Sequence, residues 1–370
     1  MLNSSMPRWI WENAFFESMD FVYDPIDMSS LFAKIDQLNQ VKSDEAILAE
    51  ILTNELVYSF LIESEVLNRD SIYSSIKRVL NPSAGQDHKQ TKLSNNLARL
   101  LQDVRQNLAQ WDTERLLNYH KGLFLHRSKH RLHPIDIGAY RRDLHGRMQV
   151  VSVRGYKTTI HYVAPPAVDL QRLMASFYQY ANRKENTREG QIAHAFIAHL
   201  IFVLIHPFDD GNGRMARLIH YNLLVRSKIL TTGYYGLSLG IHKTRKEYYN
   251  TLDILGKQAH NNLAEWVSYG VKSLEVSLDL IWQQVGLITL KERIFKCFSQ
   301  ELSDNQTRII NLLFERHLKN LRGDCVGTAL KVQKTDIELD ILHLKDLGIL
   351  KEVASKRFEL DFSMIKRVNV

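Results

Sequence analysis

The sequence predicts a mainly α-helical protein with one inserted β-hairpin and a small winged-helix module towards its C-terminal end. Apolar residues recur at helical spacing through most of the chain, whereas residues 148–163 combine β-branched and aromatic residues around a short turn. The composition shifts at 286–304, and the residues beyond it show the order helix, helix, hairpin. Because 370 residues exceed one typical domain, we expect three regions, 1–110, 111–285 and 286–370.

The N-terminal region opens with a cluster of aromatic residues and continues as a series of helices. Asp24-Pro25 marks a break, and the apolar spacing beyond it predicts helices at 28–38, 45–67 and 71–80. The polar segment 81–90, NPSAGQDHKQ, contains Pro and Gly and therefore predicts a loop. Helices follow at 93–108 and 112–125, and Asp112 or Thr113 can cap the second of them.

The pattern changes after a basic loop at 126–142. Two strands, 148–153 and 158–163, flank the turn sequence RGYK and predict the hairpin, which Ala164-Pro165-Pro166 ends. Helical spacing then returns at 169–183, 191–205, 212–227, 244–258 and 263–285. The C-terminal region adds helices at 305–317 and 334–347 and strands at 350–353 and 357–360.

The overall charge indicates an ordinary solvated surface. Lys and Arg number 48 against 41 Asp and Glu, and no long basic stretch concentrates this excess, although attraction to polyphosphate or nucleic acid stays open.

Cys297 and Cys325 lack a CxxC partner, so we expect neither a zinc site nor a disulfide framework. We expect a reduced, cytoplasmic protein. The first residues do not resemble a signal peptide. The apolar stretch 193–205 is shorter than the roughly 20 residues that cross a membrane, so we expect a buried helix and no membrane contact.

The segment 206–217, HPFDDGNGRMAR, has the properties of a phosphate-binding loop. Gly211 and Gly213 permit a sharp turn at the start of a helix, where unpaired backbone N–H groups and the helix dipole attract anions. Arg214 and Arg217 are three residues apart and share a helix face, where two guanidinium groups suit further phosphates. Asp210 beside them is suited to hold Mg²⁺, because that ion binds one or two carboxylates together with phosphate oxygens.

His206 is suited to accept a proton from an incoming hydroxyl group, because the free pKa of histidine lies near 6.5. We expect Phe208 to point back into the core and fix the loop. Each residue also has a structural interpretation: His206 as a helix-end hydrogen-bonding residue, Asp210 as an N-cap, and the arginines as surface charges. GNGRMA also fits a dinucleotide fingerprint, but here it follows a helix rather than a strand. The coincidence of all these features within twelve residues favours catalysis.

The segment resembles the signature of the Fic family of nucleotidyltransferases, His-x-Phe-x-Asp/Glu-Gly-Asn-Gly-Arg-x-x-Arg, at every fixed position. The resemblance implies a Fic-type helical bundle that transfers AMP from ATP to a Tyr, Thr or Ser hydroxyl of a protein and releases pyrophosphate. It assigns the roles of general base to His206 and of magnesium ligand to Asp210. It places the nucleotide phosphates against Gly211, Asn212, Gly213, Arg214 and Arg217.

The resemblance extends to the hairpin and to a tyrosine pair. It identifies the hairpin as the family's flap, with Ile160, His161, Tyr162 and Val163 as target-binding residues, because a free strand edge can add a target peptide. A plain structural hairpin is the alternative. In RKEYYNTL, Tyr248 would contact the adenine.

Relatives with an N-terminal helical extension carry an inhibitory helix of pattern Ser/Thr-x-x-x-Glu-Gly/Asn. Ser59 and Glu63 fit this pattern, and their spacing places them on one helix face. Glu63 would pair with Arg217 and place an anion where the γ-phosphate should bind. Ser64 departs from the pattern, which weakens the brake if that residue must adopt left-handed geometry.

The C-terminal module is a poor candidate for reading a DNA groove. Its expected recognition helix, 331–346, carries three basic residues against four acidic ones, and DNA affinity depends on phosphate neutralisation. We therefore favour a protein-contact or intramolecular role. The basic wing residues Lys351, Lys356 and Arg357 keep nucleic-acid binding open.

The sequence thus favours an ATP- and Mg²⁺-dependent protein adenylyltransferase restrained by Glu63. The chain itself is one candidate for the target protein. A homodimer is plausible by resemblance. The alternatives are removal of AMP at the same site, with Glu63 orienting a water, and a DNA-binding regulator with an idle core. The target protein, the accepting side chain and the choice of ATP over another nucleotide are not determined by these residues.

Overall fold

The computed structural model describes residues 8–83, 89–125, 135–298, 300–315, 321–322, 334–354 and 357–361. The chain divides into two compact units, Met1–Ile281 and Trp282–Val370. The first unit contains residues 1–110 and most of 111–285, and the division into three regions stays a prediction.

The N-terminal part of the first unit is helical. It contains η1 (Ile10–Glu12), α1 (Ala14–Glu17), α2 (Ser29–Asn39), α3 (Glu45–Ile62), α4 (Arg69–Leu80) and α5 (Lys92–Gln106). The longer helices begin at side-chain caps: Asp44, Asn68 and Thr91 each accept a hydrogen bond from the backbone N–H three residues on. α3 ends at Ile62 rather than at 67, because Ser64 adopts a left-handed conformation with φ 61°.

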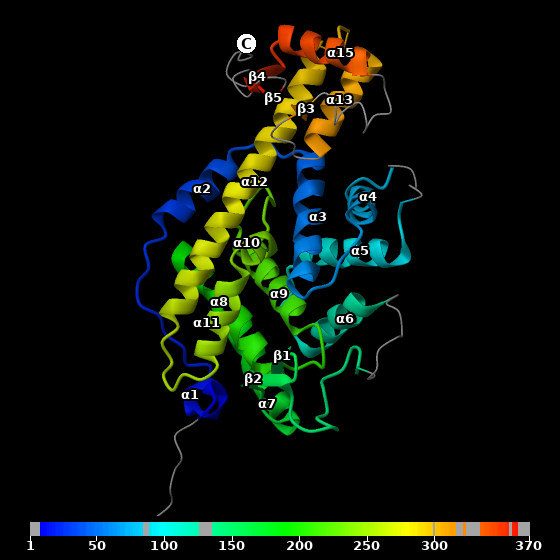
Figure 1. Ribbon diagram of the computed structural model, residues 1–370. Coiled ribbons are helices and arrows are strands. Elements are labelled where there is room, and N and C mark those ends of the chain that lie inside the picture. Colours follow the sequence, from blue (N-terminus) through cyan, green and yellow to red (C-terminus); the bar gives the residue numbers. More distant parts are fainter. Residues whose placement is uncertain are drawn as a thin grey trace, which may run out of the picture. The chain divides into compact units, whose positions relative to one another are not determined.

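The centre of the first unit is a pair of packed helices, α8 (Arg188–Ile205) and α9 (Asn212–Ser227) (Figure 1). Around them lie α6 (Thr113–Phe124), η2 (Ala167–Asp169), α7 (Leu170–Ala181), α10 (Ser238–Lys243) and α11 (Arg245–Leu255). By length and composition α8 alone among the described helices could cross a membrane, but 72% of it is buried inside the protein, as in a core helix. This agrees with the core helix expected from 193–205.

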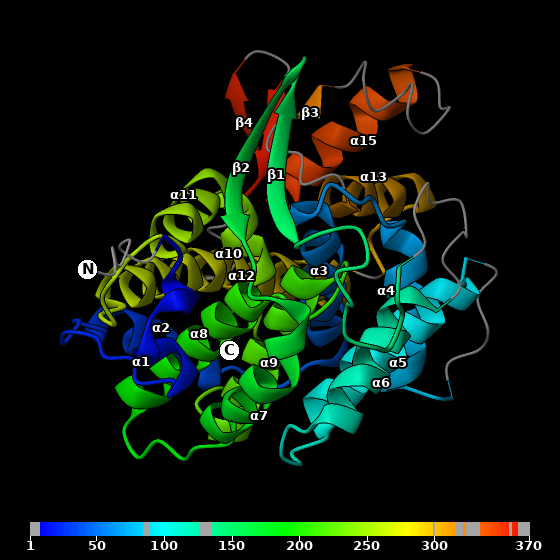
Figure 2. The ribbon, with the colours of Figure 1, turned by 90° about the horizontal axis from the view of Figure 1, so that it is seen from below.

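The hairpin consists of β1 (Gln149–Arg154) and β2 (Lys157–Val163), which pair antiparallel and form a two-stranded ribbon beyond α8 and α9 (Figure 2). The pairing register shifts between Val150 and Val151, because β2 carries one extra residue, His161, at that point. The base of the ribbon is fixed to the helices: the Tyr162 hydroxyl donates to the Leu204 carbonyl at 2.7 Å.

α12 (Ala264–Phe298) passes through the composition shift without a break. The expected helix end at 285 is therefore wrong, because residues 286–298 keep apolar side chains such as Leu290 and Ile294 at helical spacing and bury them.

The second unit adds α13 (Asp304–Glu315), β3 (Leu321–Arg322), α15 (Lys334–Asp346), β4 (Leu350–Ala354) and β5 (Arg357–Leu360). The strands form an antiparallel sheet in the order β3-β5-β4, and a separate apolar cluster joins this sheet to the helices. The expected helices and strands are present, whereas the winged-helix assignment stays a prediction. Lys331 and Lys356 lie outside the described residues.

Candidate active site

The loop between α8 and α9 turns through two left-handed residues. His206 directly follows α8, with φ 52° and ψ 58°, and Gly211, with φ 87°, directly precedes the first residue of α9. A Cβ on Gly211 would lie 3.0 Å from the Phe124 ring on α6, so both the conformation and the space at this position favour glycine. The amides of Asn212 and Gly213 open α9 and have no partner within the helix, which makes this end an anion-attracting site.

His206 is held as a neutral imidazole in one tautomer. Its Nδ1 lies 3.1 Å from the Val203 carbonyl, which can only accept, so Nδ1 carries the proton and Nε2 keeps its lone pair. Burial lowers the pKa of His206 to about 4. The side chain is therefore an unprotonated hydrogen-bond acceptor at neutral pH, which a general base requires.

The Asn212 side chain closes the loop instead of pointing outwards. Its Nδ2 donates to the Phe208 carbonyl at 2.7 Å, and its Oδ1 accepts from the Phe208 amide at 3.0 Å. The residue is only 3% exposed, and its expected contact with phosphate stays a prediction. Phe208 is fully buried, as expected, and the pair of hydrogen bonds sets the shape of the loop.

Asp210 and Arg214 meet at the start of α9. The Asp210 Oδ1 accepts from the Arg214 Nη2 at 2.8 Å and from the Gly211 amide at 2.5 Å. Arg214 also contacts Glu65 through Nη1 at 3.2 Å, and its guanidinium lies 5.0 Å from the centroids of the Phe60 and Phe124 rings. Packing on two rings fixes the guanidinium direction.

Arg217 joins α9 to the C-terminal end of α3. Its Nη2 donates to Glu63 Oε1 at 2.9 Å and to the Ser59 carbonyl at 2.7 Å, while its Nε donates to the Ser59 hydroxyl at 2.9 Å. The Glu63 carboxylate also lies over the start of α9: a Cβ on Gly213 would be 2.3 Å from Glu63 Oε1. A side-chain anion thus occupies the space directly above the anion-attracting helix end.

The two tyrosines on α11 have different surroundings. Tyr248 is 2% exposed, and its hydroxyl lies 3.0 Å from His199 Nε2 within an aromatic cluster; its contact with adenine stays a prediction. Its neighbour Tyr249 is 39% exposed and donates to the Ile62 carbonyl at 3.3 Å. Two adjacent residues of a helix lie on different faces, and here Tyr248 faces the core while Tyr249 faces outwards.

Two of the four predicted flap residues have well-exposed side chains: Ile160 is 43% exposed, and the His161 side chain is 39% exposed. Tyr162 is buried, the Val163 carbonyl accepts from the Trp11 indole at 2.7 Å, and His161 contacts Ser152 at 2.7 Å and Asp253 at 3.3 Å. The side chains near the base therefore fasten the hairpin to the helices, and the exposed part lies towards its tip.

Two residues that shape the loop escaped the sequence reasoning. Arg141 is 2% exposed and donates to the His206 carbonyl at 2.7 Å and to the Pro165 carbonyl at 2.6 Å, which links the loop to the end of the hairpin. His120 on α6 donates to the Asp210 carbonyl at 2.9 Å. Arg141 belonged to a stretch interpreted as a basic loop, and His120 to an unremarked helix face; neither has a local sequence signal.

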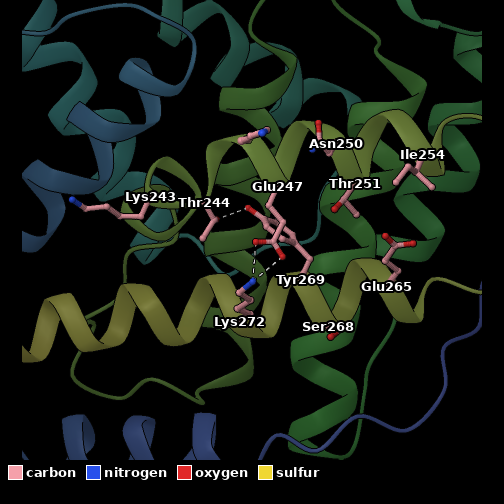
Figure 3. Close-up of a pocket in the computed structure, with 11 residues that line it drawn as sticks. Lys243, Thr244, Glu247, Asn250, Thr251, Ile254, Glu265, Ser268, Tyr269 and Lys272 are labelled. Atoms are coloured by element: carbon pink, nitrogen blue, oxygen red, sulfur yellow. Dashed lines mark hydrogen bonds and ion pairs between the residues drawn. The ribbon is translucent and has the colours of Figure 1, made fainter.

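A separate hollow of about 750 Å³ lies between α11 and α12 (Figure 3). Within it Lys272 contacts both carboxylate oxygens of Glu247 at 2.9 Å, and the Thr244 and Tyr269 hydroxyls lie 3.0 Å apart. None of residues 206–217 lines it, and its central charges pair with each other. It is therefore distinct from the loop site.

Comparisons with known proteins match a stretch of the chain that contains the loop. Residues 110–224 match the Fic/DOC family, and residues 4–81 match a domain of unknown function, DUF4172. The protein adenylyltransferase fic-1 of Caenorhabditis briggsae is 31% identical over 159 residues, which are 42% of this chain and 29% of that protein. The protein adenylyltransferase Fic of Aedes aegypti is 28% identical over 200 residues, 54% of this chain and 35% of that protein. The chain thus spans about a third of the length of these curated relatives.

Among solved structures, a Fic family protein from Desulfovibrio desulfuricans superposes with a TM-score of 0.50 at 19% identity, covering 91% of this chain and 97% of that one. This likeness concerns the fold. Together with the family match over α6 to α9 and the complete loop signature, it identifies the chain as a protein with a Fic/DOC family domain at residues 110–224.

Proposed function

We propose that the chain transfers AMP from ATP to a hydroxyl group of a protein side chain, releases pyrophosphate, and is restrained by Glu63. The observation that carries the proposal is the loop itself, where an unprotonated histidine nitrogen, a helix N-terminus and two buried arginines lie within twelve residues. The relatives named protein adenylyltransferases match the chain at modest identity.

In this reaction His206 removes the proton of the target hydroxyl through Nε2, while the hydroxyl oxygen attacks the α-phosphorus of ATP. The bond from that phosphorus to the bridging oxygen breaks, and pyrophosphate leaves. The target chain can align beside the hairpin by strand addition, with Ile160 among the exposed side chains.

The backbone amides at the start of α9 suit the nucleotide phosphates, and Arg214 and Arg217 supply positive charge on the same helix face. Stabilisation of this kind supplies most of the rate in phosphoryl and nucleotidyl transfer, where positioning matters more than covalent chemistry.

The donor set fits Mg²⁺. The described residues contain no cluster of three or more His, Cys, Asp or Glu side chains that could form a metal cage. Mg²⁺ needs none, because it binds one or two carboxylates together with substrate phosphates and water. Asp210 is the carboxylate that would hold it, and a bound Mg²⁺ would neutralise charge on the phosphates.

The proposed brake follows from the position of Glu63. Its carboxylate engages Arg217 and lies over Gly213, so it competes with a phosphate for the same positive groups. A charged hydrogen bond of this type contributes roughly 1.5–3 kcal/mol. Its removal should therefore raise transfer by roughly ten- to a hundredfold.

The test measures label transfer from α-³²P-ATP with Mg²⁺, for the chain alone and with cell lysate. Glu63→Ala should label more strongly than wild type, and adding His206→Ala should abolish the label, since a general base contributes on the order of 10²–10⁴. Glu50→Ala is the matched control, because Glu50 lies on the same helix and pairs with Arg69 away from the loop. Absence of label in Glu63→Ala, or equal labelling after loss of His206, would refute the proposed reaction.

A further inference from the structure

His120 connects α6 to the loop through every polar atom that its side chain has. The residue is fully buried, and its Nε2 lies 2.9 Å from the Asp210 carbonyl oxygen. Its Nδ1 accepts from the Gly138 amide at 3.0 Å. The ring stacks on Phe208, with centroids 3.7 Å apart and planes 10° apart.

These contacts fix one tautomer. The Gly138 amide can only donate, so Nδ1 must carry the lone pair, and the Asp210 carbonyl can only accept, so Nε2 must carry the proton. The imidazole is therefore neutral, with a single direction for its donor.

The donor determines how the Asp210–Gly211 peptide is oriented. In a planar trans peptide the C=O and the following N–H point in opposite directions. Because His120 holds the Asp210 carbonyl towards α6, the Gly211 N–H points away from α6, where it now donates to the Asp210 carboxylate at 2.5 Å. If that carboxylate turns to a metal ion, the N–H becomes available to a phosphate oxygen.

Because Gly211 has no side chain, the Asp210–Gly211 peptide can lie close enough to α6 to accept the hydrogen bond from His120. A Cβ there would lie 3.5 Å from His120 Nε2 and 3.0 Å from the Phe124 ring, so the loop backbone rests directly on α6. With φ 87° the residue also places the peptide in an orientation that L-residues rarely adopt. A helix outside the signature thus holds the backbone of the signature in place.

We propose that His120 is a positioning residue for the reaction: its Nε2–H holds the Asp210 carbonyl so that the Gly211 amide faces the nucleotide phosphates and Asp210 stays beside them. The inference rests on the proposed function. It goes beyond that function by assigning part of phosphate binding to a side chain 86 residues before the loop begins.

The test compares His120→Phe with His120→Gln in the Glu63→Ala background. Phe keeps a ring against Phe208 and removes the donor and the acceptor, whereas Gln supplies one acceptor and one donor without the ring. We expect His120→Phe to weaken MgATP affinity by about tenfold in calorimetry and to lower kcat for transfer as well. His120→Gln should recover most of that affinity.

His194→Phe is the matched control. His194 is also buried, and its Nε2 lies 2.9 Å from the Tyr180 carbonyl, but it does not contact the loop. It should lower the thermal midpoint without changing MgATP affinity. The proposal is overturned if His120→Phe binds MgATP as its parent does, or if the Phe and Gln variants lose affinity equally.

Two readouts keep the test decisive. If His120→Phe does not fold, ¹⁵N NMR of the His120 ring in the otherwise unaltered chain still decides, because an Nε2 without a proton would exclude the proposed donor. If the Glu63→Ala parent binds MgATP but transfers no label, the proposed reaction fails, while the affinity comparison still judges His120.

Discussion

At the scale of single residues, the site depends on side chains and backbone held in uncommon conformations. His206 and Ser64 are both non-glycine residues with positive φ, 52° and 61°. Such geometry costs roughly 1–2 kcal/mol per residue, so it persists only where the surroundings impose it. One of the two is the proposed base, and the other directly follows the proposed inhibitory carboxylate.

Ser64→Asn should strengthen the proposed inhibition by Glu63. Asn adopts left-handed geometry more readily than Ser, and its side-chain oxygen can replace the Ser64 hydroxyl, which accepts from Arg245 at 3.1 Å. A gain of about 0.5–1 kcal/mol in the inhibited arrangement corresponds to a roughly two- to fivefold fall in basal label transfer. In the Glu63→Ala background the same substitution should have no effect, and equal effects in both backgrounds would exclude the coupling.

At the scale of elements, α3 is held in the site from two sides. Arg217 of α9 contacts Ser59 and Glu63, and α11 contacts the last turn and the residues after it through Tyr249 and Arg245. Most residues of α3 between Ile47 and Leu56 are buried, so the helix is a core element. We therefore propose that release of the proposed brake moves only the last turn of α3.

Tyr249→Phe should loosen this last turn. The substitution removes the hydrogen bond to the Ile62 carbonyl and keeps the ring, so the loss amounts to about 0.5–1.5 kcal/mol. We expect basal label transfer to rise by roughly two- to tenfold. The MgATP affinity of a Tyr249→Phe, Glu63→Ala double variant should equal that of Glu63→Ala. A lower affinity would instead assign Tyr249 to nucleotide binding.

At the scale of the whole molecule, the first unit buries several neutral histidines. His120, His199 and His220 are each fully buried. Burial lowers the pKa of His120 to about 4 and of His220 to about 3, and lowers the pKa of His199 well below its usual value. These histidines therefore stay neutral in the folded chain at pH values at which they bind a proton in the unfolded chain.

Stability should consequently fall as the pH drops below about 6.5, the unfolded value for histidine. Between that pH and about 4 the unfolded state binds more protons, so each such histidine lowers the free energy of unfolding by about 1.4 kcal/mol per pH unit. Urea unfolding at pH 7, 6 and 5 measures this, and the midpoint should decrease at each step. His220→Phe should reduce the dependence, whereas an unchanged midpoint from pH 7 to 5 would contradict this account.

The residues that could be predicted from sequence are those whose signal is local. The start of α9 follows from two glycines before a run at helical spacing, and its bounds match the prediction. The pairing of Glu63 with Arg217 followed from a resemblance that spans two distant segments, and the contact is present at 2.9 Å. The roles of these residues in catalysis and inhibition stay predictions.

Tertiary structure alone decided which polar atoms face the proposed nucleotide site and which form hydrogen bonds within the loop. Asn212 turned inwards to Phe208, Tyr248 entered the core in place of Tyr249, and His120 and Arg141 reached the loop from 90 and 65 residues away in sequence. Periodicity gives the face of a helix but not the partner that packs against it, because that choice depends on long-range contacts. The sequence therefore determined the chemistry gathered at 206–217, and the packing of α6, α3 and α11 around it determined how that chemistry is oriented.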